Sequence, residues 1–277
     1  MADKVAHQGT SSGTSAAAER LTQGALQAKV GLAMPATSPI DEPGTSEADW
    51  AAWPALGQLP ALDISRWRSA VVVAAHPDDE ILGGGGVIAR LAAAGSRLRV
   101  VGITDGEGSH PGHRDPAALA RRRVRERQDA LQALGAAGTE VIRLGLRDAG
   151  LTGQASELAG QLRDLVTGFD ICLAPWESDA HGDHEAAGQA VRQLGVPACF
   201  YPVWMWHWAS PADARVPWPR ARRVPLSPAV RTAKQAAVAC FTSQLEPRDG
   251  GLPPMLDTGF LAHFARPWEV LLPVSSS

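Results

Sequence analysis

The sequence has no surplus of basic side chains. It carries 26 Lys and Arg against 29 Asp and Glu, which gives a formal net charge of −3 and a pI near 6.2. Because a phosphate backbone is held by a basic surface, we expect no nucleic-acid partner. Cysteine is also scarce. Cys172, Cys199 and Cys240 form no CxxC pair and lie in apolar stretches, which predicts free thiols in a reducing cytoplasm.

Long apolar runs are missing as well. No window approaches the roughly 20 apolar residues that a membrane-spanning helix needs, and the amino terminus has no charged segment followed by an apolar run. We therefore predict a protein without a membrane span that is not exported. Tyrosine occurs once against nine tryptophans, four of which lie between Trp204 and Trp218. Flat rings gathered in one region usually line a core or a pocket.

The chain nevertheless has enough apolar sequence for one large core, because 45% of its 277 residues are hydrophobic. Residues 1–43 hold few large apolar side chains, so we expect a mobile or loosely attached segment there. The remainder should form one domain. In it, 44–67 docks on the core, 68–245 forms the core, and 246–277 is a C-terminal extension rich in Pro and Gly.

Apolar strand patterns alternate with helical patterns along the core. Asp115 and Pro116 are suited to begin one of these helices, and Gly135 to end it. Regular alternation predicts an α/β fold, a Rossmann-like three-layer α/β/α sandwich with a mostly parallel sheet. The predicted strands are 71–75, 98–104, 140–144, 169–174 and 199–203, with an edge strand at 268–272. The predicted helices are 81–94, 116–134, 155–167, 185–194 and 227–240.

Polar clusters follow two of these strands where they end. The clusters consist of His76, Asp78 and Asp79 after the first strand, and of His181, Asp183 and His184 after the fourth. The carboxyl ends of parallel strands meet at one edge of the sheet, where such folds bind ligands. Two imidazoles and a carboxylate make a three-ligand metal site, and three protein ligands with an open fourth position are typical of catalytic zinc.

These residues resemble the PIG-L/LmbE-like family of zinc-dependent N-deacetylases. That family has an HPDDE motif, matched by His76–Glu80, and a later HxDH motif, matched by His181–His184, on a Rossmann-like sheet. The resemblance covers about residues 68–245, including Thr104–Glu107 and Lys234–Gln244. It implies a hydrolase that removes an N-acetyl or other N-acyl group from an amino sugar or glycoconjugate.

The resemblance also implies a role for each motif residue. One Zn²⁺ per chain, or another divalent metal, would be held by His76, Asp79 and His184. Asp78 would act as the general base, and a protonated His181 would polarise the carbonyl. Asp183 is placed to orient the imidazole of His181. Glu80 we interpret as a carboxylate that stabilises the start of a helix.

The substrate is expected to be a small N-acylated molecule that carries a sugar. Loops near the motifs, an arginine-rich helix and the tryptophan-rich segment supply candidate contacts. The substrate-binding candidates are Asp105, Glu107, Arg121, Trp176, Trp206 and His207. The identity of the substrate, the length of the acyl group and a homo-oligomeric state are left open.

Other functions also fit parts of the sequence pattern. Gly84, Gly86 and Ala89 fit the G-x-G-x-x-A signature of a dinucleotide-binding oxidoreductase, but the acidic residues before them would repel a pyrophosphate. A non-haem iron oxygenase also uses two His and one carboxylate, mostly on all-β scaffolds. An inactive ligand-binding relative would not need Asp78. The four glycines of 83–86 predict either close helix-on-sheet packing or the approach of a ligand or backbone, with equal weight.

Overall fold

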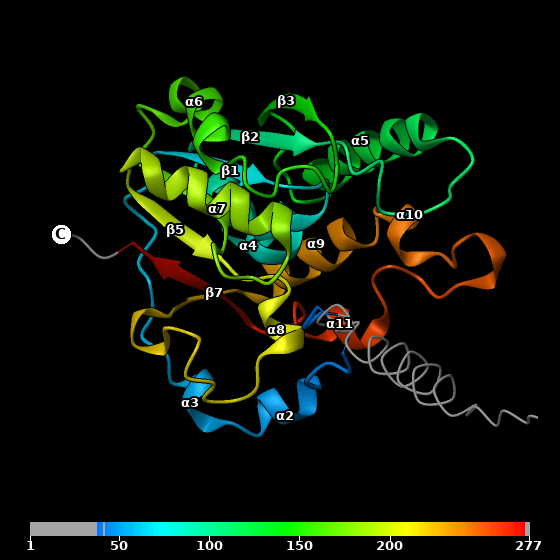
Figure 1. Ribbon diagram of the computed structural model, residues 1–277. Coiled ribbons are helices and arrows are strands. Elements are labelled where there is room, and N and C mark those ends of the chain that lie inside the picture. The colour runs from blue at the N-terminus through cyan, green and yellow to red at the C-terminus, as the bar shows by residue number, and fades with distance from the viewer. Residues whose placement is uncertain (1–37, 41, 275–277) are drawn as a thin grey trace, which may run out of the picture. The chain divides into compact units, whose positions relative to one another are not determined.

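A seven-stranded sheet forms the centre of the computed structural model, which describes residues 38–40 and 42–274 (Figure 1). The segment predicted over 1–43 thus lies almost wholly outside the described residues. The strand order is β3-β2-β1-β4-β5-β7-β6; the first five strands run parallel, and β7 is antiparallel to both of its neighbours. The predicted fold class is confirmed. The strands are β1 Ser69–Ala74, β2 Arg97–Thr104, β3 Glu140–Leu146, β4 Ile171–Pro175, β5 Ala198–Tyr201, β6 Arg222–Pro225 and β7 Trp268–Pro273.

Helices cover both faces of this sheet. Figure 1 shows α6 and α7 in front of the sheet and α4 and α9 behind it, where α9 also packs against α5. The long helices are α4 Asp79–Ala93, α5 Pro116–Ala133, α6 Ala155–Val166, α7 Gly182–Leu194 and α9 Pro228–Val238. Short helices are α2 Glu47–Ala51, α3 Pro54–Gly57, α8 Met205–Trp208, α10 Thr242–Leu245 and α11 Thr258–Ala262, with 3-10 turns η2 Trp218–Arg220 and η3 Asp249–Gly251. No helix in the described ranges is both long and apolar enough to cross a membrane.

The predicted helix signals of α5 are confirmed. The side chain of Asp115 accepts a hydrogen bond from the backbone N–H of Ala118, Pro116 occupies the first turn, and Gly135 has a φ of +73° just past the end. A side-chain cap satisfies a backbone donor that has no partner inside the helix, and a left-handed glycine ends the helix without steric cost. The local sequence therefore sets the position of this helix.

Helix α4 packs directly on the sheet through its glycines. A Cβ on Gly83 would lie 2.1 Å from Cδ2 of Tyr201, and one on Gly86 would lie 2.5 Å from a methyl group of Leu226. The buried ion pair of Lys234 and Glu269 fixes the same helix, since Glu269 accepts hydrogen bonds from the N–H groups of Gly86 and Val87. Protein side chains fill the space at Gly83 and Gly86, so helix packing accounts for these two glycines.

The segment 44–67 contacts the domain mainly through tryptophan. Ser46 and Asp49 form a reciprocal cap on α2, and Trp50 is fully buried. The indole N–H of Trp50 donates to the backbone oxygen of Trp206 at 2.8 Å, and the two rings meet edge to face with centroids 5.2 Å apart. A bridge between Ala61 and β6 adds a backbone connection.

The carboxyl-terminal end of the sheet differs from the prediction. The strand over 268–272 was expected at an edge, yet β7 lies between β5 and β6. That expectation was wrong because β6 was missed: Arg222–Pro225 is four residues long, carries two arginines and ends at a proline, so it shows no apolar alternation. The sheet thus continues past residue 245, where we had placed the end of the core.

Candidate active site

The two polar clusters meet at the carboxyl ends of β1 and β4, which are neighbouring parallel strands. The rings of His76 and His184 have centroids 5.4 Å apart, and His181 lies 5.0 Å from His76 and 4.6 Å from His184. Both helices that follow begin earlier than predicted, so Asp79 and His184 stand on the first turns of α4 and α7 rather than on loops. Helix starts hold these groups more rigidly than loops do.

Asp78 has an unusual backbone conformation. Its φ is 141°, a region that costs a residue with a Cβ on the order of 1–3 kcal/mol and that is found mostly where function requires it. The carboxylate is buried and accepts a hydrogen bond from Nη2 of Arg123 at 3.0 Å. Burial raises the pKa of Asp78 to about 7, and the nearby Arg123 opposes that rise. A carboxylate tuned in this way suits proton transfer near neutral pH.

Asp79 lies between two histidines. Its Oδ2 accepts the backbone N–H of His76 at 2.8 Å, and its Oδ1 lies 3.1 Å from Nε2 of His184. Burial alone would raise the pKa of Asp79, but attraction to His184 and His76 holds it well below its usual value. Burial likewise opposes the rise in the pKa of His184, which Asp79 and Asp179 bring to about 9. The arrangement favours an ionised carboxylate with a positive charge beside it.

Asp179 orients His184, and the sequence analysis did not single it out. Its Oδ2 lies 2.7 Å from Nδ1 of His184, and its two oxygens also accept the backbone N–H groups of Val203, Trp204 and Met205. Asp179 is fully buried. A carboxylate behind an imidazole is the usual outer partner of a metal-bound histidine. The signal available in the sequence was an acidic residue five positions before His184.

His76 has two further carboxylate neighbours. Its Nε2 lies 3.1 Å from Asp148 and 3.3 Å from Asp183. Asp183 also accepts the backbone N–H groups of Ala149 and Leu151. The prediction that Asp183 orients His181 is therefore corrected: its hydrogen bonds reach His76 and the loop after β3, and none of those described joins it to His181.

His181 is expected to be neutral in this setting. Burial, together with the neighbouring His184 and His76, lowers the pKa of His181 to about 3. The prediction of a protonated His181 is corrected for the same reason, since a third positive ring among two others is unfavourable. The ring lies parallel to the indole of Trp204, with centroids 6.2 Å apart and 15° between the planes.

The donor set fits a divalent metal ion. Nε2 of His184 and Nδ1 of His181 are buried and have no hydrogen-bond partner among the described residues. One nitrogen from each of His76, His181 and His184 lies within 4.8 Å of the others, and His76, Asp148 and Asp183 form a second such group. Imidazole nitrogens with carboxylate oxygens suit zinc and other first-row divalent ions.

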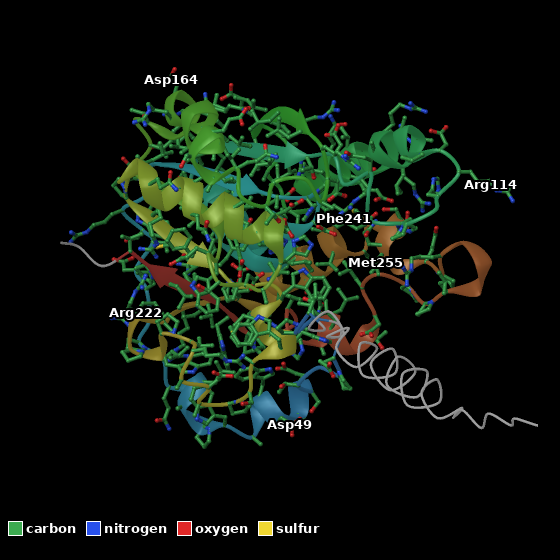
Figure 2. All side chains as sticks on the ribbon, viewed as in Figure 1. Asp49, Arg114, Asp164, Arg222, Phe241 and Met255 are labelled. Carbon is green, nitrogen blue, oxygen red and sulfur yellow. The ribbon has the colours of Figure 1, made fainter. Side chains whose placement is uncertain are left out.

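A cavity of about 250 Å³ opens above these groups. Its lining is partly apolar and partly polar, and it includes two arginines. The apolar lining is Leu82, Val203, Trp204, Met255, Leu256 and Phe260, and the polar lining beyond the motifs includes Ser109, Arg123, Asp148, Gln244 and Arg248. Figure 2 shows Met255 on the segment that leads toward α11. Most of these residues belong to elements distant in sequence from the motifs, so no local pattern could reveal them.

The predicted polar substrate contacts do not line this cavity. Asp105 forms an ion pair with Arg143 at 2.5 Å, and Glu107 accepts the backbone N–H of Asp148. The side chain of Arg121 is 64% exposed. Arg123, two residues later on the same arginine-rich helix, lines the cavity instead.

The predicted aromatic contacts also lie elsewhere. Trp176 and Trp206 are buried in the core, at 3% and 4% exposure, and Trp206 packs against Trp50. Nε2 of His207 lies 2.8 Å from the backbone oxygen of Glu42. Composition predicted an aromatic cluster correctly, but only Trp204 of this segment faces the cavity.

Residues 71–194, which contain both motifs, match the family model described as PIG-L, GlcNAc-PI de-N-acetylase. This part of the chain is similar to the PIG-L family. The match includes β1 through α7 and therefore every motif residue named above. The resemblance inferred from the motifs is thus confirmed for this part of the chain.

Two curated relatives match parts of this chain. The 1D-myo-inositol 2-acetamido-2-deoxy-alpha-D-glucopyranoside deacetylase of Kineococcus radiotolerans is 37% identical over 93 residues, covering 30% of this chain and 26% of that protein. The diacetylchitobiose deacetylase of Thermococcus kodakarensis is 28% identical over 137 residues, covering 47% of this chain and 51% of that protein. The chain matches between about a quarter and a half of the relatives' length.

Solved structures share the fold of this chain. A triple mutant of a deacetylase of the teicoplanin biosynthetic pathway superimposes with a TM-score of 0.58 and 19% identity, covering 76% of this chain and 98% of that one. The 4-carboxy-2-hydroxymuconate hydratase of Pseudomonas putida KT2440 gives a TM-score of 0.54 and 18% identity, covering 76% and 97%. At these identities the likeness shows the fold alone.

Proposed function

We propose that this protein is a metal-dependent amide hydrolase that removes an N-acetyl group from an amino sugar or glycoconjugate. One observation carries the proposal: buried imidazole nitrogens without partners converge with Asp78 and Asp79 at the base of a cavity. The PIG-L family match and the two curated deacetylases support the reaction and the class of substrate. The three free cysteines are compatible with the reducing cytoplasm that we propose as its location.

Each residue of the candidate site has its own proposed role. His76, Asp79 and His184 are the proposed metal ligands, and a bound divalent ion supplies Lewis-acid catalysis. Asp78 removes a proton from the attacking water, while Arg123 holds its carboxylate in place at 3.0 Å. His181 donates a hydrogen bond to the amide oxygen as negative charge develops there.

The alternative oxidoreductase function has little structural support. A dinucleotide needs glycine backbone exposed at the start of a helix, directly after the strand. Here Gly86 faces Leu226 and Glu269 inside the protein, and all four glycines of 83–86 are buried.

Two isosteric substitutions test the metal and base assignments separately. Asp79→Asn should lose most of its bound metal, because it removes an anionic ligand. Asp78→Asn should keep the metal and lose about 10²- to 10⁴-fold in turnover, the usual contribution of a general base. Elemental analysis and amine release from N-acetylated sugars measure the two effects. The reverse pattern would refute the roles, and wild-type protein that binds no divalent metal would refute the function.

A further inference from the structure

A second cavity adjoins the candidate active site. It has a volume of about 280 Å³, and its lining shares Pro111 and Arg248 with the catalytic cavity. The other lining residues come from the loop before α5 and the segment around η3. They are His110, Gly112, His113, Gly250 and Leu252. A substrate whose amide lies at the metal-binding groups can therefore extend past Arg248 into this space.

Arg248 is held so that its terminal nitrogens are available. Its Nε donates to the backbone oxygen of Pro253 at 2.7 Å, and its backbone N–H donates to Leu252. Among the described side chains, neither Nη atom has a hydrogen-bond partner, and no carboxylate lies within ion-pair distance. A guanidinium anchored through Nε presents its two Nη groups in the fork that matches phosphate or carboxylate oxygens.

His113 adds a donor on the same side, whereas Nδ1 of His110 lies 2.9 Å from Oγ of Ser109 and the His110 ring also hydrogen-bonds to the backbone of Ser243. The backbone N–H of Asp115 donates to Nδ1 of His113 at 3.1 Å, so a neutral His113 carries its proton on Nε2. The rings of His110 and His113 stand perpendicular, with centroids 6.1 Å apart. Burial lowers the pKa of His110, and the nearby Arg123 and Arg248 act in the same direction.

Among the side chains that the structure describes, neighbouring carboxylates do not neutralise this cluster. Asp148 contacts His76 and the backbone of Gly108, and Glu246 forms an ion pair with Arg122. In a chain with a net charge of −3, a basic concentration without acidic partners is unusual. It favours an anion from solution.

We propose that the second cavity is an anion subsite in which Arg248, aided by His113, binds a phosphate or carboxylate carried by the substrate away from its amide. The apolar wall at Trp204 and Phe260 would face the sugar ring between the two ends. This inference rests on the proposed deacetylase function and narrows its substrate to anionic N-acetyl amino sugars.

Three substrates with one sugar test the subsite: the methyl glycoside of N-acetylglucosamine, N-acetylglucosamine 1-phosphate, and the carboxymethyl glycoside. The metal-loaded wild type should show a kcat/KM for at least one anionic substrate about ten- to a hundredfold above that for the methyl glycoside, the range of a charged hydrogen bond. The anionic substrate with the higher kcat/KM shows whether the subsite prefers phosphate or carboxylate. Arg248→Gln should bring the anionic-to-neutral ratio near one.

Arg114→Gln is the matched control. Arg114 is exposed, lines neither cavity and projects outward from the loop before α5 in Figure 2, so this variant changes the net charge equally and should leave the ratio unaltered. Equal kcat/KM values for the three substrates in wild type, or a ratio unaffected by Arg248→Gln, would overturn the subsite and leave the hydrolase intact.

A binding measurement separates this proposal from the proposed function. The affinity of N-acetylglucosamine 1-phosphate and of the carboxymethyl glycoside is measured by calorimetry on Asp78→Asn, with and without Arg248→Gln. If wild type releases no amine, but Asp78→Asn binds an anion in a manner that depends on Arg248, the deacetylase function is refuted and the anion subsite is retained. Binding of neither anion, or binding that does not depend on Arg248, would overturn the subsite.

Discussion

Nδ1 of His184 lies 2.7 Å from Asp179, whereas Nε2 on the opposite side of the ring has no hydrogen-bond partner among the described residues. The carboxylate thereby fixes the ring orientation and leaves one nitrogen directed at Asp79, 3.1 Å away. Such an outer partner increases the basicity of the ligand and holds it in one tautomer.

Asp179→Asn should weaken metal affinity about 10- to 100-fold, the usual cost of losing an outer-shell carboxylate. Competition against a chelating dye measures the affinity. Asp164→Asn is the control, because Asp164 is exposed on α6 (Figure 2) and lies outside the candidate site. Equal affinity in the two variants would mean that His184 does not bind the metal through Nε2.

Gly83→Ala and Gly84→Ala should differ in sign. A Cβ on Gly83 would overlap Tyr201, which is fully buried and donates to the backbone oxygen of Val73, so the variant should lose about 1–3 kcal/mol of unfolding free energy. A Cβ on Gly84 would lie 3.9 Å from Leu173, an ordinary contact, so this variant should gain about 0.5–1 kcal/mol from helix propensity. Urea denaturation measures both. Equal losses would show that α4 does not pack as described.

Arg127→Met should destabilise the protein by about 3–5 kcal/mol, because it leaves the carboxylate of Glu80 buried without its partner. Nε of Arg127 donates to Glu80 at 2.7 Å, and both side chains are almost completely buried. The double variant Arg127→Met/Glu80→Met should recover most of the loss in a urea titration. If the effects of the single changes simply add, the pair is not coupled.

Glu47 should contribute stability that depends on pH. Burial alone would raise its pKa, but hydrogen bonds from His263 and Arg266 outweigh burial and lower the pKa below the usual 4.5. A depressed pKa in the folded state stabilises the protein above about pH 4.5, and this stability is lost as the pH falls through the folded-state value. Glu47→Gln should therefore lower the free energy of unfolding at pH 7 and differ less from wild type at pH 3. Chemical denaturation at both pH values measures this, and a constant difference would contradict it.

The sequence was sufficient to predict which residues form the two motifs and that the motifs lie close together in the fold. Each motif directly follows a strand, and parallel strands bring their carboxyl ends to one edge, so His76 and His184 converge without any knowledge of distant packing. Helix caps such as Asp115 are equally local, because donor and acceptor lie within one turn.

The cavity walls were beyond local inference. Arg248 and Asp148 reach the site from loops whose positions depend on how α10 and β3 pack, and their sequence neighbours show no motif. Trp206 shows the converse: hydrophobicity predicts that a ring avoids water, but whether it faces core or cavity depends on its partners, here Trp50. The partner of Asp183 was misjudged because Asp183 stands in the first turn of α7, whereas His181 is the extended residue before that helix, so closeness in sequence did not make them partners.

The position of β7 has a consequence for how the chain assembles. It is the one strand partner of β6 within the described ranges, and β6 in turn bridges to Ala61 near the docking segment. Neither β6 nor the docking segment 44–67 can therefore join the sheet before residues 268–273 are in place. During synthesis on the ribosome, this side of the domain would be completed last, after the edge that carries the motifs has formed.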